Sequence, residues 1–257
     1  MGKYLKNKTF IITGATKGLG EVVSKYFSLE GMTLILLGRD KKALKMIKNT
    51  CSKKSSIYTY TFDLLDNESV TKNIKKVMNK FNTIDGVIHI AGGGYGFREP
   101  LLDYNKFLTL LNLNLLSIVT INNLVIPQMV KNKKGNILHI GSIAGVEAVA
   151  SVGYNTSKAA LNGYVRSLGN EFAKDNIIIN GINPGGFEAP NNAMARLKVN
   201  NKDAYDDFVN KKLPRNKMGN ATELLEMIKL LSSDNASMLC GSMITMDAGE
   251  GNSYERI

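Results

Sequence analysis

A serine, a tyrosine and a lysine in the middle of the sequence have the types and spacing to transfer a proton. Tyr154 lies twelve residues after Ser142, and Lys158 follows four residues later. Tyr154 and Lys158 begin an amphipathic stretch, and residues four apart share one face of a helix, which brings the ammonium close to the phenol. A nearby cation lowers the pKa of tyrosine from about 10 towards the range useful at neutral pH. We therefore predict an acid–base site at these residues.

Three glycines form a second chemical pattern near the start of the chain. Gly14, Gly18 and Gly20 follow the apolar run 10–13 and precede an amphipathic stretch. In a strand–turn–helix unit, such glycines allow a tight turn and a close approach of the backbone to a pyrophosphate, while the helix N-terminus offers free N–H groups to the anion. A glycine cluster alone is weak evidence. Its position after the first strand predicts a dinucleotide site.

The elements that must position these residues follow from periodicity. Short, continuously apolar runs, typical of strands covered on both faces, alternate with longer amphipathic stretches. The alternation predicts an α/β fold with one parallel sheet, right-handed crossovers and helices on both faces. The expected strands are residues 9–13, 33–37, 57–62, 84–90, 136–140, 177–182 and 243–246, and the expected helices are residues 19–30, 41–51, 69–81, 104–131, 154–174 and 222–232.

The sequence contains neither an internal repeat nor a linker that would divide two domains, so residues 1–257 are predicted to form a single domain. The segment 188–216 interrupts the alternation because it is polar and rich in Asn and Lys. We interpret it as one or two mobile helices that form a lid over the site, with a long decorated surface loop as the alternative.

The spacing Thr-Gly-x-x-x-Gly-x-Gly at residues 13–20, joined to the serine, tyrosine and lysine pattern, resembles the short-chain dehydrogenase/reductase family, and further matches extend over nearly the whole chain. The resemblance implies a Rossmann-type, doubly wound sheet of seven parallel strands in a three-layer α/β/α sandwich. It also implies a nicotinamide cofactor and hydride transfer to or from a carbonyl or secondary alcohol.

The resemblance implies a role for each catalytic side chain. Tyr154 would protonate the substrate oxygen and Ser142 would hold that oxygen by a hydrogen bond. Lys158 would bind the nicotinamide ribose and lower the pKa of Tyr154. Asn114 matches the family's asparagine that anchors a proton-relay water, with Asn112 as a competing candidate and a plain polar helix residue as a further alternative.

The end of the second strand bears on the choice of cofactor. Gly38 stands where NAD-preferring members carry an acid, and Arg39 follows it. An arginine there can bind a 2′-phosphate, and Lys17 in the glycine turn is similar to the second basic residue of NADP-type members. We expect NADP(H) in preference to NAD(H). In the alternative, Arg39 is an ordinary surface residue and Asp40 reaches the ribose.

The other cofactor positions implied by the resemblance also lie in turns that follow strands. Asp63 has a helix cap as its alternative role. His89 and Ile90 replace two asparagines that are usual in the family, and His89 is expected to be a satisfied strand-end residue and not a catalyst. Ala189 replaces a usual threonine, so contacts there are expected from backbone groups. The full set is Gly14, Thr16, Lys17, Gly18, Leu19, Gly20, Arg39, Asp63, Leu64, Ala91, Gly92, Tyr154, Lys158, Pro184, Gly185 and Phe187.

The amino-acid composition argues against nucleic acid, metal ions and membranes as partners. The chain has 33 Lys and Arg against 22 Asp and Glu, a formal charge of +11, but the lysines are scattered and no arginine cluster is interleaved with aromatic residues. We expect a solvated basic surface and no nucleic-acid partner. Cys51 and Cys240 lie far apart without metal-ligand spacing, so we expect no disulfide, no metal and a reduced, cytoplasmic setting. No run approaches the ~18 apolar residues that span a bilayer, so we expect no membrane.

The substrate and assembly stay open. A 3-oxoacyl thioester, as in the 3-oxoacyl-carrier-protein reductases that the chain resembles, would suit Arg98 and surface lysines near a phosphopantetheine carrier. A sugar or sugar-phosphate ketone is the alternative, favoured by the polar lid. A non-catalytic, cofactor-sensing protein is a third hypothesis, and the intact catalytic residues argue against it. The closing turn 247–249 resembles a family segment near subunit interfaces, so we expect a homotetramer, or otherwise a dimer.

Overall fold

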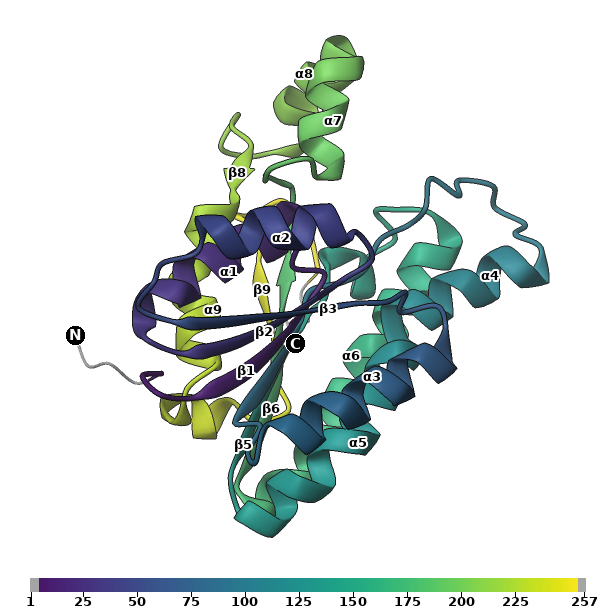
Figure 1. The fold of residues 1–257 in the computed structure, drawn as a ribbon. Helices are drawn as coiled ribbons and strands as arrows, with labels where there is room; N and C mark the ends of the chain where they lie inside the picture. Colours follow the sequence, from purple (N-terminus) through teal and green to yellow (C-terminus); the bar gives the residue numbers. More distant parts are fainter. Residues whose placement is uncertain (1–4, 254–257) are drawn as a thin grey trace.

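The computed structural model describes residues 5–253, and in it one sheet of seven parallel strands lies at the centre of the molecule (Figure 1). The strand order is β3-β2-β1-β4-β5-β6-β9, so the order reverses between β1 and β4, as in a doubly wound Rossmann-type sheet. This confirms the expected fold class. The strands are β1 (Thr9–Thr13), β2 (Thr33–Gly38), β3 (Ser56–Thr61), β4 (Gly86–His89), β5 (Gly135–Ile140), β6 (Ile177–Pro184) and β9 (Met243–Met246).

Helices cover both faces of the sheet and complete the three layers (Figure 1). One face is covered by α1 (Gly18–Phe27), α2 (Lys41–Thr50) and α9 (Leu225–Leu231), and the other by α3 (Asn67–Lys80), α5 (Ser117–Asn132) and α6 (Val152–Phe172). Each face of the sheet therefore has its own apolar core, which explains why the strands are continuously apolar and not alternating.

Local sequence explains how these helices begin and pack. The Asp66 carboxylate accepts a hydrogen bond from the Ser69 N–H at 3.0 Å and caps α3. Val70, Ile74 and Val77 then recur at helical spacing and are fully buried against the sheet. Strand and helix boundaries elsewhere differ from the expected ranges by a few residues, as is usual at element ends.

The expected helix over residues 104–131 is divided. It consists of α4 (Tyr104–Leu111), a π turn (Asn112–Leu116) and α5. In the described part of the chain, the combined stretch Tyr104–Asn132 is the one helix long and apolar enough to cross a membrane, by length and composition alone, and 44% of its most apolar window is buried. This differs from the expectation of no such stretch. The inward face of α5 packs in the core, and the core helices of globular proteins can be equally long and apolar.

Segment 188–216 forms two helices, α7 (Ala193–Asn200) and α8 (Lys202–Lys212), which project beyond the sheet (Figure 1). The pair is joined to the body by two short strands, β7 (Phe187–Glu188) and β8 (Gly219–Asn220). The helices have a small core of their own, made by Tyr205, Val209, Leu213 and Met218. We call α7 and α8 the helical pair.

Candidate active site

The three residues of the predicted acid–base site meet beyond the carboxyl ends of the central strands. Ser142 follows β5, and Tyr154 and Lys158 lie in the first two turns of α6. A side-chain hydrogen bond joins Ser142 to Tyr154. The Lys158 ammonium lies 5.8 Å from the centre of the Tyr154 ring. In open α/β sheets this edge is where ligands bind, so the sequence spacing and the tertiary position agree.

Lys158 is buried, with an exposed fraction of 3%, and its Nζ donates a hydrogen bond to the Ile140 carbonyl at 2.8 Å. Burial lowers the pKa of Lys158 to about 8. The ammonium therefore remains the main form at neutral pH, although it is costly to bury. A pKa lowered in this way, next to other polar catalytic candidates, is typical of functional sites.

The pKa of Tyr154 moves in the direction opposite to the expected one. Burial raises it to about 12, and the hydrogen bond with Ser142 offsets only part of this rise. The reason is that desolvation of the phenolate dominates, while the Lys158 ammonium is directed to the Ile140 carbonyl. The phenol is consequently protonated at neutral pH, which is the form that can donate a proton to an oxygen.

The π turn separates the two candidate asparagines. Asn114 is fully buried and holds Gly93 through two backbone hydrogen bonds of 3.0 Å, and it also donates to the Leu110 carbonyl at 2.9 Å. A β-carbon on Gly92 would lie 2.9 Å from Asn114 Oδ1 and 3.3 Å from Lys158 Nζ. Asn114 thus lies in the site, next to the lysine.

Asn112 lies elsewhere. It lines an outer groove of about 320 Å³ together with Leu64, Asn67, Leu116 and residues at the start of α5. The π turn adds one residue to the helical repeat, and such turns are frequent at functional sites. The geometry therefore favours Asn114 over Asn112 for the predicted fourth position.

The glycine turn packs closely on the end of β4. Gly14 has φ +67°, and a β-carbon there would lie 2.8 Å from the Ala91 Cα. Thr13 Oγ1 accepts hydrogen bonds from the Ile90 and Ala91 N–H groups at 3.1 and 3.2 Å. The turn then enters α1 through Gly18, Leu19 and Gly20, all buried. This glycine cradle at a helix N-terminus fits a dinucleotide pyrophosphate.

The end of β2, which carries Gly38 and Arg39, lies beside this turn. A β-carbon on Gly38 would lie 2.7 Å from Thr16 Cγ2, so only glycine fits here without displacing a stiff, β-branched side chain. An acid at position 38 would therefore require Thr16 to move, and the turn that carries Lys17 contacts the strand end that carries Arg39. Asp40 is engaged as the cap of α2, where it accepts from the Ala43 N–H at 3.0 Å.

Asp63 and Leu64 follow β3. Asp63 does not cap α3, because Asp66 does. Asp63 instead accepts from the Leu65 N–H at 3.0 Å and pairs with the Arg39 guanidinium at 3.5 Å. Arg39 is 57% exposed at this edge. The contact shows that the ends of β2 and β3 form one surface at the expected adenosine end.

The Pro-Gly turn after β6 is held by the C-terminal segment. The Gly185 N–H donates to the Met246 carbonyl at 3.1 Å, and the Gly186 N–H donates to Glu250. Phe187 then begins β7, and Ala189 is buried. The Gly18 N–H donates to the Pro190 carbonyl at 2.7 Å, so the segment below the helical pair contacts the glycine turn.

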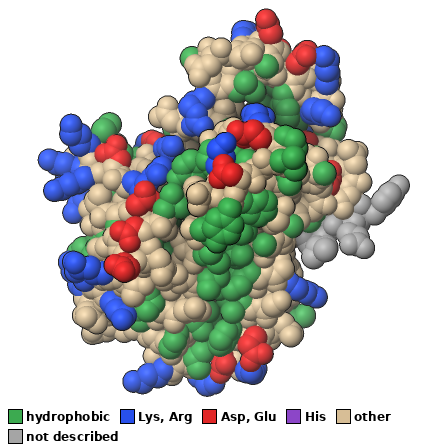
Figure 2. Space-filling model, turned by 90° about the vertical axis from the view of Figure 1, so that its right-hand side faces the viewer, with side chains coloured by type: hydrophobic (Ala, Val, Ile, Leu, Met, Phe, Trp, Pro, Cys, Tyr) green, Lys and Arg blue, Asp and Glu red, His purple; other side chains and the backbone are tan. Residues whose placement is uncertain are grey.

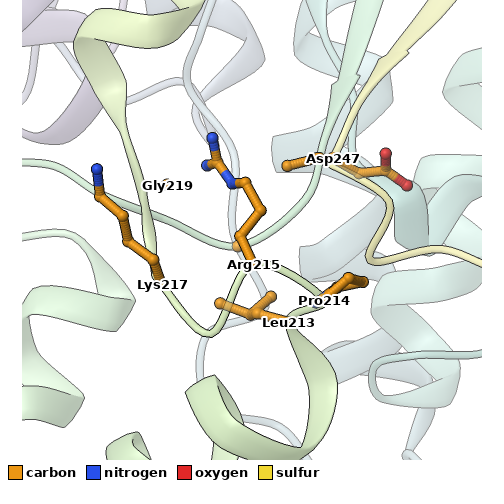
Figure 3. A pocket seen from close by; sticks show the side chains of 8 residues that line it. Leu213, Pro214, Arg215, Lys217, Gly219 and Asp247 are labelled. Carbon is orange, nitrogen blue, oxygen red and sulfur yellow. The ribbon is translucent and has the colours of Figure 1, made fainter.

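A small pocket lies at the base of the helical pair, between Leu213, Pro214, Arg215 and Lys217 on one side and Asp247 on the other (Figure 3). Its volume of about 10 Å³ is at the lower limit for one water molecule, so it is not a site for a substrate. Within residues 5–253, His, Cys, Asp and Glu side chains form no group of three or more that could hold a metal ion.

Asn183, which sequence reasoning did not select, belongs to the site. It is fully buried at the end of β6, and its Oδ1 accepts the Ser142 N–H at 3.0 Å. Its Nδ2 is buried and has no partner in the described chain. An asparagine directly before Pro184 at the buried end of β6 was the available signal, because a buried amide requires a polar neighbour.

His89 lies at the end of β4, where it contacts Asn122 and His139 and makes no contact with Ser142 or Tyr154 in the described chain. Its Nε2 pairs with Asn122 Oδ1 at 2.9 Å and its ring stacks on His139 at 5.0 Å, whereas its Nδ1 has no partner among the described residues. Only one of the two ring nitrogens of His89 is therefore hydrogen-bonded, whereas the sequence led us to expect a fully hydrogen-bonded residue. Burial lowers the pKa of His89 to about 4, so the ring is neutral at pH 7.

Comparison with known proteins agrees with this geometry. The family model described as short chain dehydrogenase matches residues 8–200. The chain belongs to the short chain dehydrogenase family. It is 30% identical over 256 residues to the oxidoreductase UcpA of Escherichia coli, covering 97% of this chain and 96% of UcpA. It is 28% identical over 251 residues to the 3-oxoacyl-[acyl-carrier-protein] reductase FabG of Aquifex aeolicus, covering 95% and 98%.

Among solved structures, the fold is similar to L-sorbose reductase from Gluconobacter frateurii complexed with NADPH and L-sorbose. The TM-score is 0.90 at 24% identity, covering 98% of this chain and 100% of that one. The short chain dehydrogenase described here is an oxidoreductase, and the non-catalytic alternative is not supported.

Proposed function

We propose that this short chain dehydrogenase reduces a carbonyl group with NADPH, using Tyr154, Ser142, Lys158 and Asn114. The observation that carries the proposal is the buried, charged Lys158 beside the hydrogen-bonded Ser142 and Tyr154 at the carboxyl edge of the sheet. A bound nicotinamide supplies the hydride. The chain's own side chains then have to orient the carbonyl and protonate its oxygen.

Each side chain is suited to one part of that task. The Ser142 hydroxyl, whose backbone is fixed by Asn183, holds the carbonyl oxygen as negative charge develops. Tyr154, with a pKa of about 12, keeps its proton until this oxygen accepts it. The Lys158 ammonium, 5.8 Å from the centre of the Tyr154 ring, attracts the phenolate that remains, although this attraction does not outweigh the desolvation that raises the pKa of Tyr154. Asn114 fixes the backbone at Gly93 beside the lysine.

The preference for NADPH is supported by packing at the end of β2. An acid at position 38, which would hold a ribose 2′-hydroxyl, would displace the Thr16 side chain, and Asp40 is engaged in capping α2. Arg39 and Lys17 remain as the cations for a 2′-phosphate. Solved relatives that share the fold include reductases described with NADPH or NADP. We expect a kcat/KM at least tenfold higher with NADPH than with NADH.

For the substrate we propose a 3-oxoacyl thioester first. The FabG relatives, 27–28% identical over nearly the whole chain, support it. A sugar ketone is the second candidate, since the helical pair above the turn is polar and Asn192 caps the start of α7. A panel of acyl thioesters, sugar ketones and simple ketones, followed by NADPH oxidation at 340 nm, tests both.

We also propose a homotetramer, with a dimer as the next assembly, in the cytoplasm. Figure 2 shows a continuous band of apolar side chains on the face that lies to the right in Figure 1. The elements there expose Tyr104 of α4, Leu116 of the π turn and Val152 of α6, at 77%, 42% and 50%. An exposed apolar band of this kind indicates a protein interface. Light scattering of the purified chain measures the assembly.

The catalytic assignment is tested by Tyr154→Phe. The variant should lose about 10²- to 10⁴-fold in kcat because it lacks the donated proton, while it binds NADPH as the wild type does. Tyr58→Phe, which removes the hydroxyl of a half-buried tyrosine of β3 and keeps its ring contact with Phe81, is the matched control. NADPH oxidation and NADPH fluorescence report the two properties. Retention of a tenth of the wild-type rate by Tyr154→Phe would refute the assignment.

A further inference from the structure

The loop after β4 holds one aromatic residue in an unusual backbone conformation. Tyr95 has φ +54°, and it lies between Gly94 and Gly96, of which Gly96 also has a positive φ, at +77°. A non-glycine residue in the left-handed region costs of order 1 kcal/mol, and such residues cluster at binding sites and active sites. We therefore expect the Tyr95 side chain to make a specific contact.

That contact is with the arginine at the end of β2. Arg39 Nη1 donates a hydrogen bond to the Tyr95 hydroxyl at 3.3 Å, and the same nitrogen lies 3.5 Å from Asp63. The Tyr95 ring stacks on Phe97, with ring centres 5.8 Å apart and planes 22° apart. Three segments distant in sequence therefore meet at the Arg39 guanidinium.

The remaining donors of this cluster are free within residues 5–253. The Tyr95 oxygen accepts from Arg39, so its own proton is available, and no acceptor for it lies in the described chain. The Arg39 contacts all run through Nη1, which leaves the other guanidinium N–H groups available. Lys17 is exposed in the adjoining turn, and its ammonium likewise makes no hydrogen bond or ion pair with the described residues.

We propose that Tyr95 is a ligand of the cofactor's 2′-phosphate, acting with Arg39 and Lys17. Its hydroxyl donates to a phosphate oxygen, and its contact with Arg39 restrains the guanidinium in the orientation that binds this anion. The inference rests on the proposed preference for NADPH. A hydroxyl donor added to two cations gives the three phosphate oxygens separate partners. The stack on Phe97 and the left-handed backbone hold this donor at the mouth of the site.

Two variants separate the hydroxyl from the ring. Tyr95→Phe keeps the ring and its stack but removes the donor. Tyr95→Gly removes the side chain and also relieves the backbone strain, because glycine adopts a positive φ without cost. Since Tyr95 is 42% exposed, both variants are expected to fold. Tyr58→Phe, in β3 and packed on Phe81, is the control.

Binding of the fragments adenosine 2′,5′-bisphosphate and 5′-ADP, measured by calorimetry, isolates the 2′-phosphate without turnover. Tyr95→Phe should raise the Kd of the 2′-phosphorylated fragment about three- to tenfold, as for one exposed hydrogen bond to a charged group, and leave the Kd of 5′-ADP unchanged. Tyr95→Gly should raise the first Kd at least as much. KM for NADPH should rise in parallel, with kcat unchanged.

The outcomes are distinguishable. If the wild type binds both fragments equally, the proposed preference for NADPH fails. If the wild type prefers the 2′-phosphorylated fragment and both variants retain that preference, Tyr95 is not a ligand and the inference is overturned. Equal weakening of both fragments in Tyr95→Phe would also overturn it, because the residue would then serve the adenosine and not the phosphate.

Discussion

The Lys158 ammonium should make the folded protein less stable than it would be with an apolar residue in its place. Lys158 is 3% exposed, and it forms no ion pair with a carboxylate in the described part of the chain. Burial alone is the cause of its lowered pKa. We therefore expect Lys158→Met, a substitution of similar length without charge, to be inactive as an enzyme and yet to gain stability at neutral pH.

The magnitude follows from the pKa. Burial lowers it from 10.5 to about 8, and at about 1.36 kcal/mol per pH unit this shift of about 2.5 units corresponds to about 3 kcal/mol. Below pH 8 both the folded and the unfolded chain carry the proton, and the whole cost is present. Between pH 8 and 10.5 the unfolded chain binds more protons, so the stability of the wild type rises with pH. About 2 kcal/mol is recovered by pH 9.5.

Urea unfolding of the wild type and Lys158→Met at pH 7 and pH 9.5 measures this effect. Loss of the hydrogen bond to the Ile140 carbonyl offsets about 1 kcal/mol of the variant's gain, but it does so at both pH values. The difference in unfolding free energy between the two proteins should therefore shrink by about 2 kcal/mol at pH 9.5. The same difference at both pH values would show that Lys158 is not buried as an ammonium.

Further predictions concern a pair of glycines and His89. Gly163→Ala, in the interior of α6 with nothing within 4 Å of the new β-carbon, should stabilise the protein by about 0.5–1 kcal/mol in thermal unfolding. Gly14→Ala should lower both stability and NADPH affinity, because its φ is +67° and the Ala91 backbone is 2.8 Å away; unchanged affinity would contradict the cradle. Burial lowers the pKa of His89 from 6.5 to about 4, so the unfolded chain binds a proton that the folded chain does not between these pH values. The free energy of unfolding should therefore decrease by up to about 3 kcal/mol from pH 6.5 to pH 4, and by less in His89→Asn. Urea unfolding that gives parallel pH profiles for the two proteins would contradict this.

The fold could be predicted because its signals are local. Continuous apolar runs such as residues 34–37 indicate a strand covered on both faces, and the helical spacing of Val70, Ile74 and Val77 indicates a helix buried along one face. The division of the expected helix at 104–131 could not be predicted, since the π turn forms where Asn114 turns inward to hold Gly93, a contact 21 residues away in the sequence.

Within the site, the sequence by itself determined the glycine turn and the pairing of Tyr154 with Lys158, because both depend on the geometry of a single turn or helix. Only the tertiary structure decided that desolvation raises the pKa of Tyr154, since burial depends on all the elements packed around it. The contacts of Asn183 with Ser142 and of Tyr95 with Arg39 likewise join segments 41 and 56 residues apart. No local pattern encodes such contacts, because they arise only where the ends of different strands meet at one edge of the sheet.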